Sequence, residues 1–168
     1  TGEVIGIHMD PRVALAKALI GAALVPPRPG AEGELAAVIG RPCKDVPAAR
    51  AAENILGYTI ANDVTARDLQ DKDGQWTRAK GFDTFCPLGP WIETDFQVDG
   101  QIIETRVDGD LRQHASLNSM IHGVERIISH VSEVMTLLPG DIILTGTPAG
   151  IGRIEAGQTV EVTIEGIG

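Results

Sequence analysis

The chain has 168 residues, a formal net charge of −9 at neutral pH, and 43% hydrophobic against 22% charged residues. This composition and length predict one globular domain with a substantial core. The negative charge argues against a nucleic-acid partner, because phosphate backbones are bound by positive surfaces. No apolar run reaches the ~20 residues of a membrane span, so no membrane association is expected.

Glycine and cysteine usage adds two expectations. The 20 glycines and 10 prolines favour turns and short strands over a helix bundle. Cys43 and Cys86 lie far apart and in no CxxC pattern, which favours two reduced core residues over a single disulfide. The printed sequence does not start with the basic and apolar pattern of a secretory signal, and we expect a cytoplasmic protein.

The first part of the chain predicts short elements. They are a strand at 4–7, a strand or helical turn at 11–20, a loop or extended segment at 26–30, a strand at 32–40 and a helix at 48–55. Asp45 is the expected N-cap of that helix, with Pro47 just inside it and Gly57 after its end.

The remaining elements are predicted in the same way. They are a strand at 58–64, a polar turn at 71–75, a return to the core at 85–92, strands at 96–98 and 102–107, a helix at 117–137, and strands at 142–145 and 158–165. Asp99-Gly100 and Asp108-Gly109 are both type I′ hairpin signals, which predicts three antiparallel strands joined by tight turns. Ser116 or Asn118 would cap the long amphipathic helix.

Three carboxylates are candidate metal ligands. Glu32 and Glu34 are two residues apart on a predicted strand, so both side chains point to the same face. Asp63 lies in the next strand, where Asp is uncommon. Three carboxylates without clustered His or Cys suit Mg²⁺, Mn²⁺ or Ca²⁺ rather than zinc. The alternative is that the two glutamates are solvated on the open face of a half-buried strand.

Other polar residues near Asp63 have two interpretations each. Lys80 would stabilise an enolate oxygen beside a metal, or would be a surface lysine with a buried stem. Arg67, Asp68 and Gln70 form either a helical surface or a carboxylate-binding face.

The glycine-rich segment GTPAGIG at 146–152 is either a structural turn or a loop that offers backbone N–H groups and the Thr147 hydroxyl to a carboxylate. It lacks the GK[ST] ending of a phosphate-binding P-loop, so a nucleotide-binding module is a minor alternative. The four histidines have no metal-ligand spacing.

These motifs resemble, in order, those of the fumarylacetoacetate hydrolase superfamily. The matching segments are EGELAAVIGRPCKDV (32–46), GYTIANDVTARDLQ (57–70), QWTRAKGFDTFCPLGPWI (75–92), VDGDLRQ (107–113), MTLLPGDIILTGTPAGIG (135–152) and GQTVEVTIEGIG (157–168). The resemblance is to small bacterial members that act as 2-hydroxyhepta-2,4-diene-1,7-dioate isomerases, acylpyruvate hydrolases or oxaloacetate decarboxylases.

The resemblance implies a mixed, β-rich (α+β) fold, a β-roll with one long amphipathic helix, in a homodimer with one divalent metal per subunit. It implies that Glu32, Glu34 and Asp63 hold the metal, magnesium or else manganese or calcium. Lys80 would be catalytic. The implied substrate-binding residues are Arg67, Gln70, Thr84 and Thr147.

The chain departs from the family at its N-terminus. Residues 1–31 predict a shortened or incomplete lid region, and residues 32–168 the catalytic domain. The family's N-Y-x-x-H-x-x-E lid segment, whose His and Glu activate water in the hydrolases, is not found, and His8 is no safe substitute. The hydrolytic base is therefore not identified, which favours isomerase or decarboxylase chemistry over hydrolysis.

We therefore expect a metal-dependent enzyme for small anionic 2-oxo or enol dicarboxylates, an isomerase or decarboxylase of the 2-hydroxyhepta-2,4-diene-1,7-dioate type. Acylpyruvate (fumarylpyruvate) hydrolysis and oxaloacetate decarboxylation are the alternatives of the same class. The alternative of another class is a non-catalytic metal-binding or dimerisation module.

Overall fold

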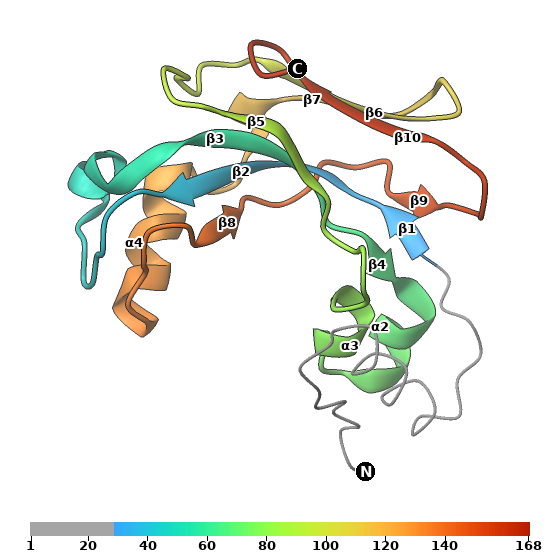
Figure 1. Cartoon of the computed structure of the whole chain (residues 1–168), viewed down its shortest axis with the longest axis horizontal. Helices are drawn as coiled ribbons and strands as arrows, with labels where there is room; N and C mark the ends of the chain where they lie inside the picture. The colour runs from blue at the N-terminus through green and yellow to red at the C-terminus, as the bar shows by residue number, and fades with distance from the viewer. Residues whose placement is uncertain (1–28) are drawn as a thin grey trace.

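A computed structural model describes residues 29–168, and these form a mixed α+β fold on three antiparallel sheets (Figure 1). The first sheet has the order β4-β1-β9, with β1 at Pro29–Ala31, β4 at Thr65–Ala66 and β9 at Gly152–Arg153. The second has the order β10-β6-β7, with β6 at Ile102–Val107, β7 at Asp110–Ser116 and β10 at Val160–Ile164. The third has the order β5-β3-β2-β8, with β2 at Gly33–Ile39, β3 at Ile55–Asn62, β5 at Leu88–Glu93 and β8 at Ile142–Leu144.

The helical elements are short. They are the 3-10 helices η1 (Ala48–Asn54) and η2 (Leu117–Ser119) and the α-helices α2 (Arg67–Asp73), α3 (Thr77–Lys80) and α4 (Val124–Val134). The elements predicted at 4–7 and 11–20, and His8, lie outside the described residues. Among the described residues, no helix has the length and apolarity to cross a membrane.

The core forms where β2 and β3 meet the β10-β6-β7 sheet and α4. Leu35 and Ile39 of β2 belong to one buried cluster with Ile103 of β6, Ile164 of β10 and Ile128 of α4. All seven residues of β2 are buried, so buried and exposed positions do not alternate along this strand. Figure 1 shows the second sheet lying over β2 and β3, with α2 and α3 beside β4 at the far end of the molecule.

The predicted helix at 117–137 is wrong in length. Ser116 caps only the short η2, by accepting a hydrogen bond from the Asn118 N–H, and α4 begins after Gly123. Met120, with ψ of 132°, is not helical, and Gly123 takes extended backbone, so the helix is interrupted where glycine, a poor helix former, occurs. Met135 is again extended, so the helix ends at Val134.

One of the two hairpin predictions is confirmed. Asp108 and Gly109 both have positive φ, 51° and 86°, and join β6 to β7 as a type I′ turn requires. No strand forms at 96–98. There the Asp99 N–H and the Gln97 carbonyl bond to the Gln101 side chain, which competes with strand pairing. The third strand of that sheet is β10, from the end of the chain.

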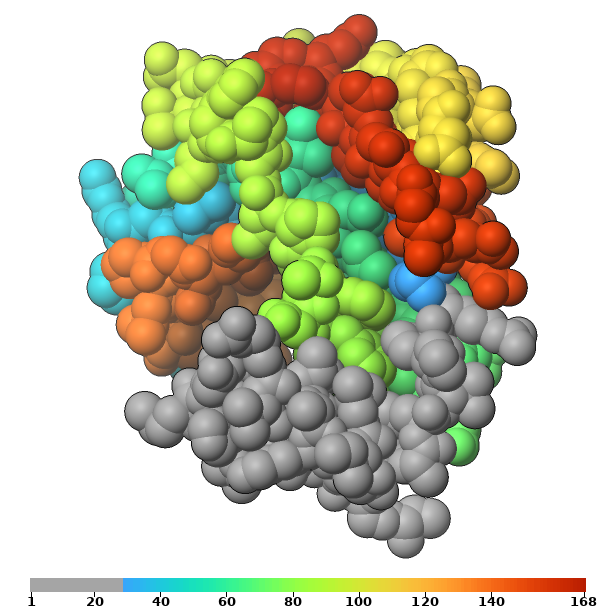
Figure 2. Space-filling view, turned by 45° about the vertical axis from the view of Figure 1, so that its right-hand side comes forward, coloured from blue at the N-terminus to red at the C-terminus, as the bar shows by residue number. Residues whose placement is uncertain are grey.

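Three smaller predictions also need correction. The helix at 48–55 is the 3-10 helix η1, with Pro47 rather than Asp45 at the N-cap position and no side-chain cap. Most of the polar turn predicted at 71–75 belongs to α2, which ends at left-handed Gly74. β5 does not re-enter the core, because it is an end strand of its sheet with largely exposed residues; Figure 2 shows this part of the chain, in lime, uncovered across one face.

Candidate metal and substrate site

Glu32, Glu34 and Asp63 converge on one point. Each offers a carboxylate oxygen, and these oxygens all lie within 4.8 Å of one another. Glu32 and Glu34 are only 5% and 4% exposed, so the alternative that they are solvated on an open strand face is wrong. The predicted pair on one face of the strand is therefore a buried pair.

Strand pairing brings the third carboxylate to the other two. Gly33 of β2 pairs with Asn62 of β3, and Asp63 directly follows β3 rather than lying within a strand as predicted. The Asp63 N–H donates to the Glu32 carbonyl at 2.9 Å. The Glu32 N–H in turn donates to the Asn62 side-chain oxygen at 2.8 Å. Asn62 was missed from the sequence, although an asparagine at the end of a largely apolar strand is a signal for such a role.

Two cations flank the carboxylates, each from a different helix. Arg67, the first residue of α2, donates to the Glu32 carboxylate and, at 2.6 Å, to the side-chain oxygen of Gln70. Lys80, the last residue of α3, donates to the Asp63 carboxylate and, at 2.9 Å, to the Thr65 hydroxyl. Arg67, Gln70 and Lys80 are thus gathered at the carboxylate cluster, whereas the alternatives placed them on the surface.

The surroundings of Glu34 shift its pKa strongly. Burial raises its pKa from 4.5 to about 7, although the Gly146 N–H, at 2.7 Å from its carboxylate, acts in the opposite direction. The neighbouring Asp63 and Glu32 carboxylates raise this pKa further, and Lys80 lowers it. Additional positive charge stabilises the ionised form of a buried carboxyl group that lies beside two others.

The residues present fit a hard divalent cation. The cluster offers carboxylate oxygens and contains no His or Cys, a donor set that suits Mg²⁺, Mn²⁺ or Ca²⁺ rather than a soft metal. Among residues 29–168, three carboxylates face two cationic side chains, and this group of described residues has a net negative charge in a largely buried place. A buried charge is costly unless it is paired, and a divalent cation would pair it.

The two threonines predicted to bind substrate have different surroundings. Thr84 is exposed in left-handed backbone, with φ of 70°, and within residues 29–168 it has no hydrogen bond to the three carboxylates. Cys86 shares this unusual backbone, with φ of 58°. A left-handed β-branched residue is strained, and such strain gathers at functional sites. Both cysteines are free, as predicted, but Cys86 is only half-buried.

Thr147 instead contacts the residue between the two glutamates, and its hydroxyl already makes two hydrogen bonds. It donates to the Gly33 carbonyl at 2.9 Å and accepts from the Gln113 amide at 2.8 Å. The GTPAGIG loop therefore directs Gly146 and Thr147 to the carboxylate strand. This arrangement favours the structural interpretation of the loop over phosphate binding.

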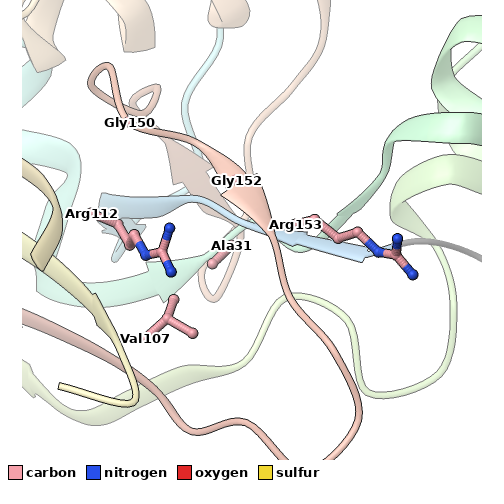
Figure 3. Close-up of a pocket in the computed structure, with 6 residues that line it drawn as sticks. All are labelled: Ala31, Val107, Arg112, Gly150, Gly152 and Arg153. Atoms are coloured by element: carbon pink, nitrogen blue, oxygen red, sulfur yellow. The ribbon is translucent and has the colours of Figure 1, made fainter. Parts of the chain in front are cut away.

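A shallow pocket behind this loop does not reach the carboxylates. It is lined by Ala31, Val107, Arg112, Gly150, Gly152 and Arg153 (Figure 3). The guanidinium of Arg112 lies beside Ala31 and Val107, whereas that of Arg153 points away from it. The two arginines do not converge, so this pocket does not present a paired cationic site for an anion. The carboxylate cluster is therefore the candidate site.

Comparison with known proteins decides the family. The family model described as "Fumarylacetoacetate (FAA) hydrolase C-terminal" matches residues 13–168. The chain belongs to the fumarylacetoacetate hydrolase family. This confirms the resemblance, and it places the chain in a family of enzymes.

Curated and solved members of the fumarylacetoacetate hydrolase family agree. Protein Rv2993c of Mycobacterium tuberculosis is 65% identical over 140 residues, which are 82% of this chain and 53% of that protein. The crystal structure of 2-hydroxyhepta-2,4-diene-1,7-dioate isomerase from Mycobacterium marinum is 64% identical, with a TM-score of 0.83 over 84% of this chain and 56% of that one. Fumarylacetoacetate hydrolase from Exiguobacterium antarcticum is 45% identical, with a TM-score of 0.83 over 88% and 56%.

These structural matches confirm the predicted β-rich α+β fold of the family. The amphipathic helix of that prediction is α4, which is shorter than expected. The chain spans little more than half the length of these relatives. The boundary predicted between residues 31 and 32 stays a prediction, although β1, which precedes it, already pairs with β4 and β9.

Proposed function

We propose that this chain carries the catalytic site of a divalent-metal-dependent enzyme for small 2-oxo or enol dicarboxylates. The observation that carries the proposal is the buried convergence of Glu32, Glu34 and Asp63, with carboxylate oxygens within 4.8 Å of one another. When bound there, magnesium, or else manganese or calcium, would supply a Lewis acid for a 2-oxo group and its neighbouring carboxylate.

The charges around the cluster favour an anionic substrate only when the cation is bound. Three carboxylates against Arg67 and Lys80 leave the site negative, and the whole chain is at −9. A divalent cation would make the same group of residues positive overall. Metal binding would therefore precede binding of the dicarboxylate.

Each remaining site residue has a role that its position supports. Lys80, held at the edge of the cluster by Asp63, stabilises negative charge that develops on a substrate oxygen. Arg67 and Gln70, which are bonded to each other beside Glu32, orient a substrate carboxylate. Thr84, on an exposed segment, is a further substrate-binding residue. Thr147 is proposed as a substrate-binding residue as well, next to the carboxylates through its bond to the Gly33 carbonyl.

Isomerase or decarboxylase chemistry is the first choice of reaction. The 64% identity to the isomerase of Mycobacterium marinum supports it. Hydrolysis is the second choice of reaction, with an acylpyruvate as the substrate, and the 45% identity to the fumarylacetoacetate hydrolase of Exiguobacterium antarcticum supports that reaction type.

Turnover measurements test this proposal directly. The full chain would be assayed with 2-hydroxyhepta-2,4-diene-1,7-dioate, oxaloacetate and acetylpyruvate, with Mg²⁺ and with a chelator. We expect Mg²⁺-dependent turnover of the first or second compound, whereas turnover of acetylpyruvate alone would favour hydrolysis. Mg²⁺ binding without turnover of any compound would support the non-catalytic module instead.

We also propose a homodimer, as the family resemblance implies. The end strand β5 exposes Leu88, Trp91 and Ile92 at 45%, 55% and 43%, an apolar surface of the kind that partners cover. Light scattering on the purified chain should give twice the monomer mass. Trp91→Glu should shift the mass towards the monomer, whereas Trp76→Glu, which changes an equally exposed tryptophan just before α3, should not. A monomer before any substitution would contradict the proposal.

A further inference from the structure

The backbone of the residue between the two glutamates is held at both its N–H and its carbonyl group. Gly33 separates Glu32 from Glu34, and its N–H donates to the Gln113 side-chain oxygen at 2.9 Å. Its carbonyl accepts from the Thr147 hydroxyl at 2.9 Å. We call these two side chains and the Gly33 backbone the Gly33 clamp. Because the Gly33 backbone sets where both neighbouring side chains start, the clamp controls how the two carboxylates converge.

Gln113 uses the full hydrogen-bonding capacity of its amide nitrogen inside this clamp. Its Nε2 donates one hydrogen to the Thr147 hydroxyl and the other to the Pro148 carbonyl, both at 2.8 Å. The reversed orientation of the amide would set its N–H₂ against the Gly33 N–H, two donors facing each other, so only one orientation fits. Gln113 is 1% exposed, and losing it would leave buried partners unpaired.

A β-bulge aims Gln113 at the glutamates. Thr105 of β6 pairs with Gln113 and Arg106 pairs with Leu111, so Arg112 is the extra residue on β7. Bulges redirect side chains, and directly opposed residues share one face of a sheet. Gln113 therefore lies with Thr105 on the face that meets β2.

Two glycines allow the close approach that the clamp needs. A Cβ on Gly33 would lie 2.2 Å from the Thr105 hydroxyl oxygen. A Cβ on Gly150, where φ is already 105°, would lie 2.0 Å from the carbonyl oxygen of the bulge residue Arg112. Figure 3 shows Gly150 and Arg112 on these neighbouring segments. Any larger residue at either position would push the loop or the sheet away from β2.

We propose that Gln113 is a positioning residue for the metal site, acting through Gly33 on the Glu32 and Glu34 carboxylates. This inference rests on the proposed function, because Gln113 would position the ligands of the same metal site. Residues that orient metal ligands through hydrogen bonds typically contribute about 10–100-fold to metal affinity. The competing interpretation is that Gln113 only fills the core, in which case it contributes to stability and not to affinity.

The test is Mn²⁺ binding by the full chain, measured calorimetrically at a temperature where each variant is folded. Gln113→Met keeps the length of the side chain and removes the amide, and we expect it to weaken Mn²⁺ binding by about tenfold or more. The matched control is Ser132→Ala. Ser132 is also fully buried and makes two hydrogen bonds, to the Val46 N–H and the Ser129 carbonyl, outside the site. The Ser132→Ala variant should lose stability while its Mn²⁺ affinity stays unchanged.

The other outcomes separate failure of this inference from failure of the proposed function. Normal Mn²⁺ affinity in Gln113→Met would overturn the inference alone, as would an equal loss in Ser132→Ala. No Mn²⁺ binding by the unaltered chain would overturn the proposed function, and the inference with it. If Gln113→Met does not fold, Thr147→Val and Thr147→Ser decide from the other side of the clamp. Valine should weaken Mn²⁺ binding and serine should restore it, and equal affinity in both would overturn the inference.

Discussion

Two glutamates that lie on strands and have neighbouring cations show pKa shifts in opposite directions. Glu34 of β2 is buried with two other carboxylates, and burial raises its pKa to about 7. Glu104 of β6 bonds to His114 at 3.0 Å and to Arg106 at 2.9 Å, and these hydrogen bonds lower its pKa. The difference teaches that nearby cations alone do not identify a ligand-binding carboxylate. A carboxylate that is buried without enough positive charge around it does indicate a site, because a bound cation would stabilise its charged form.

The largest expected effect separates these two glutamates by function. Glu34→Gln keeps the size of the side chain and should lower Mg²⁺-dependent turnover by at least ~100-fold, since even residues that only support a metal ligand cost about 10–100-fold. Glu104→Gln, the matched control, should leave turnover within about twofold, the scale of a surface change. Equal turnover in the two variants would remove Glu34 from the site.

Lys80 should affect the chemical step more than the metal. Lys80→Met should lower kcat by about 10²–10³-fold, the usual cost of losing one group that stabilises developing charge. Mg²⁺ affinity should hold or increase, because Lys80 now donates to Asp63, a proposed ligand. Steady-state kinetics over a range of Mg²⁺ concentrations measures both. Lys44→Met is the control, since Lys44 pairs with Asp45 at the surface, and a loss of kcat there would contradict the assignment.

The pH dependence of stability should reveal Glu34 in the metal-free protein. Between pH 4.5 and about 7 the folded state keeps a proton on Glu34 that the unfolded state has lost, so rising pH favours unfolding. Denaturant titrations with a chelator present should therefore show a contribution that is full below pH 4.5 and lost as pH rises through about 7. Glu34→Gln should remove this contribution. Mg²⁺ should stabilise the unaltered chain more at pH 8 than at pH 6.

The smallest effect is expected from Glu104, with the opposite sign. Its lowered folded pKa means that its contribution is present above 4.5 and is lost as pH falls through the folded value. Glu104→Gln should flatten the acid side of the stability curve slightly, because partly exposed ion pairs are weak. Denaturant titrations from pH 3 to 6 measure this. An effect of Glu104→Gln on stability as large as that of Glu34→Gln would contradict the comparison.

Local sequence rules worked where the interacting residues are close along the chain. The period of two predicted that Glu32 and Glu34 share a face, and Asp108-Gly109 predicted a type I′ turn, because both depend only on neighbouring backbone. The same rules misjudged Asp99-Gly100 and the start of α4. At these places Gln101 and Gly123 changed the local hydrogen bonding or the backbone.

The sequence by itself determined the family, the β-rich fold and the residue types available for a metal, because motifs and alternation are properties of the printed order. Only the tertiary structure decided that the two glutamates are buried, that Arg67 and Lys80 face them, and that Gln113 supports them. Gln113 lies 80 positions from Gly33, and Thr147 lies 34 positions beyond Gln113. Burial and such distant hydrogen bonds arise from the packing of one sheet on another, which no local pattern encodes.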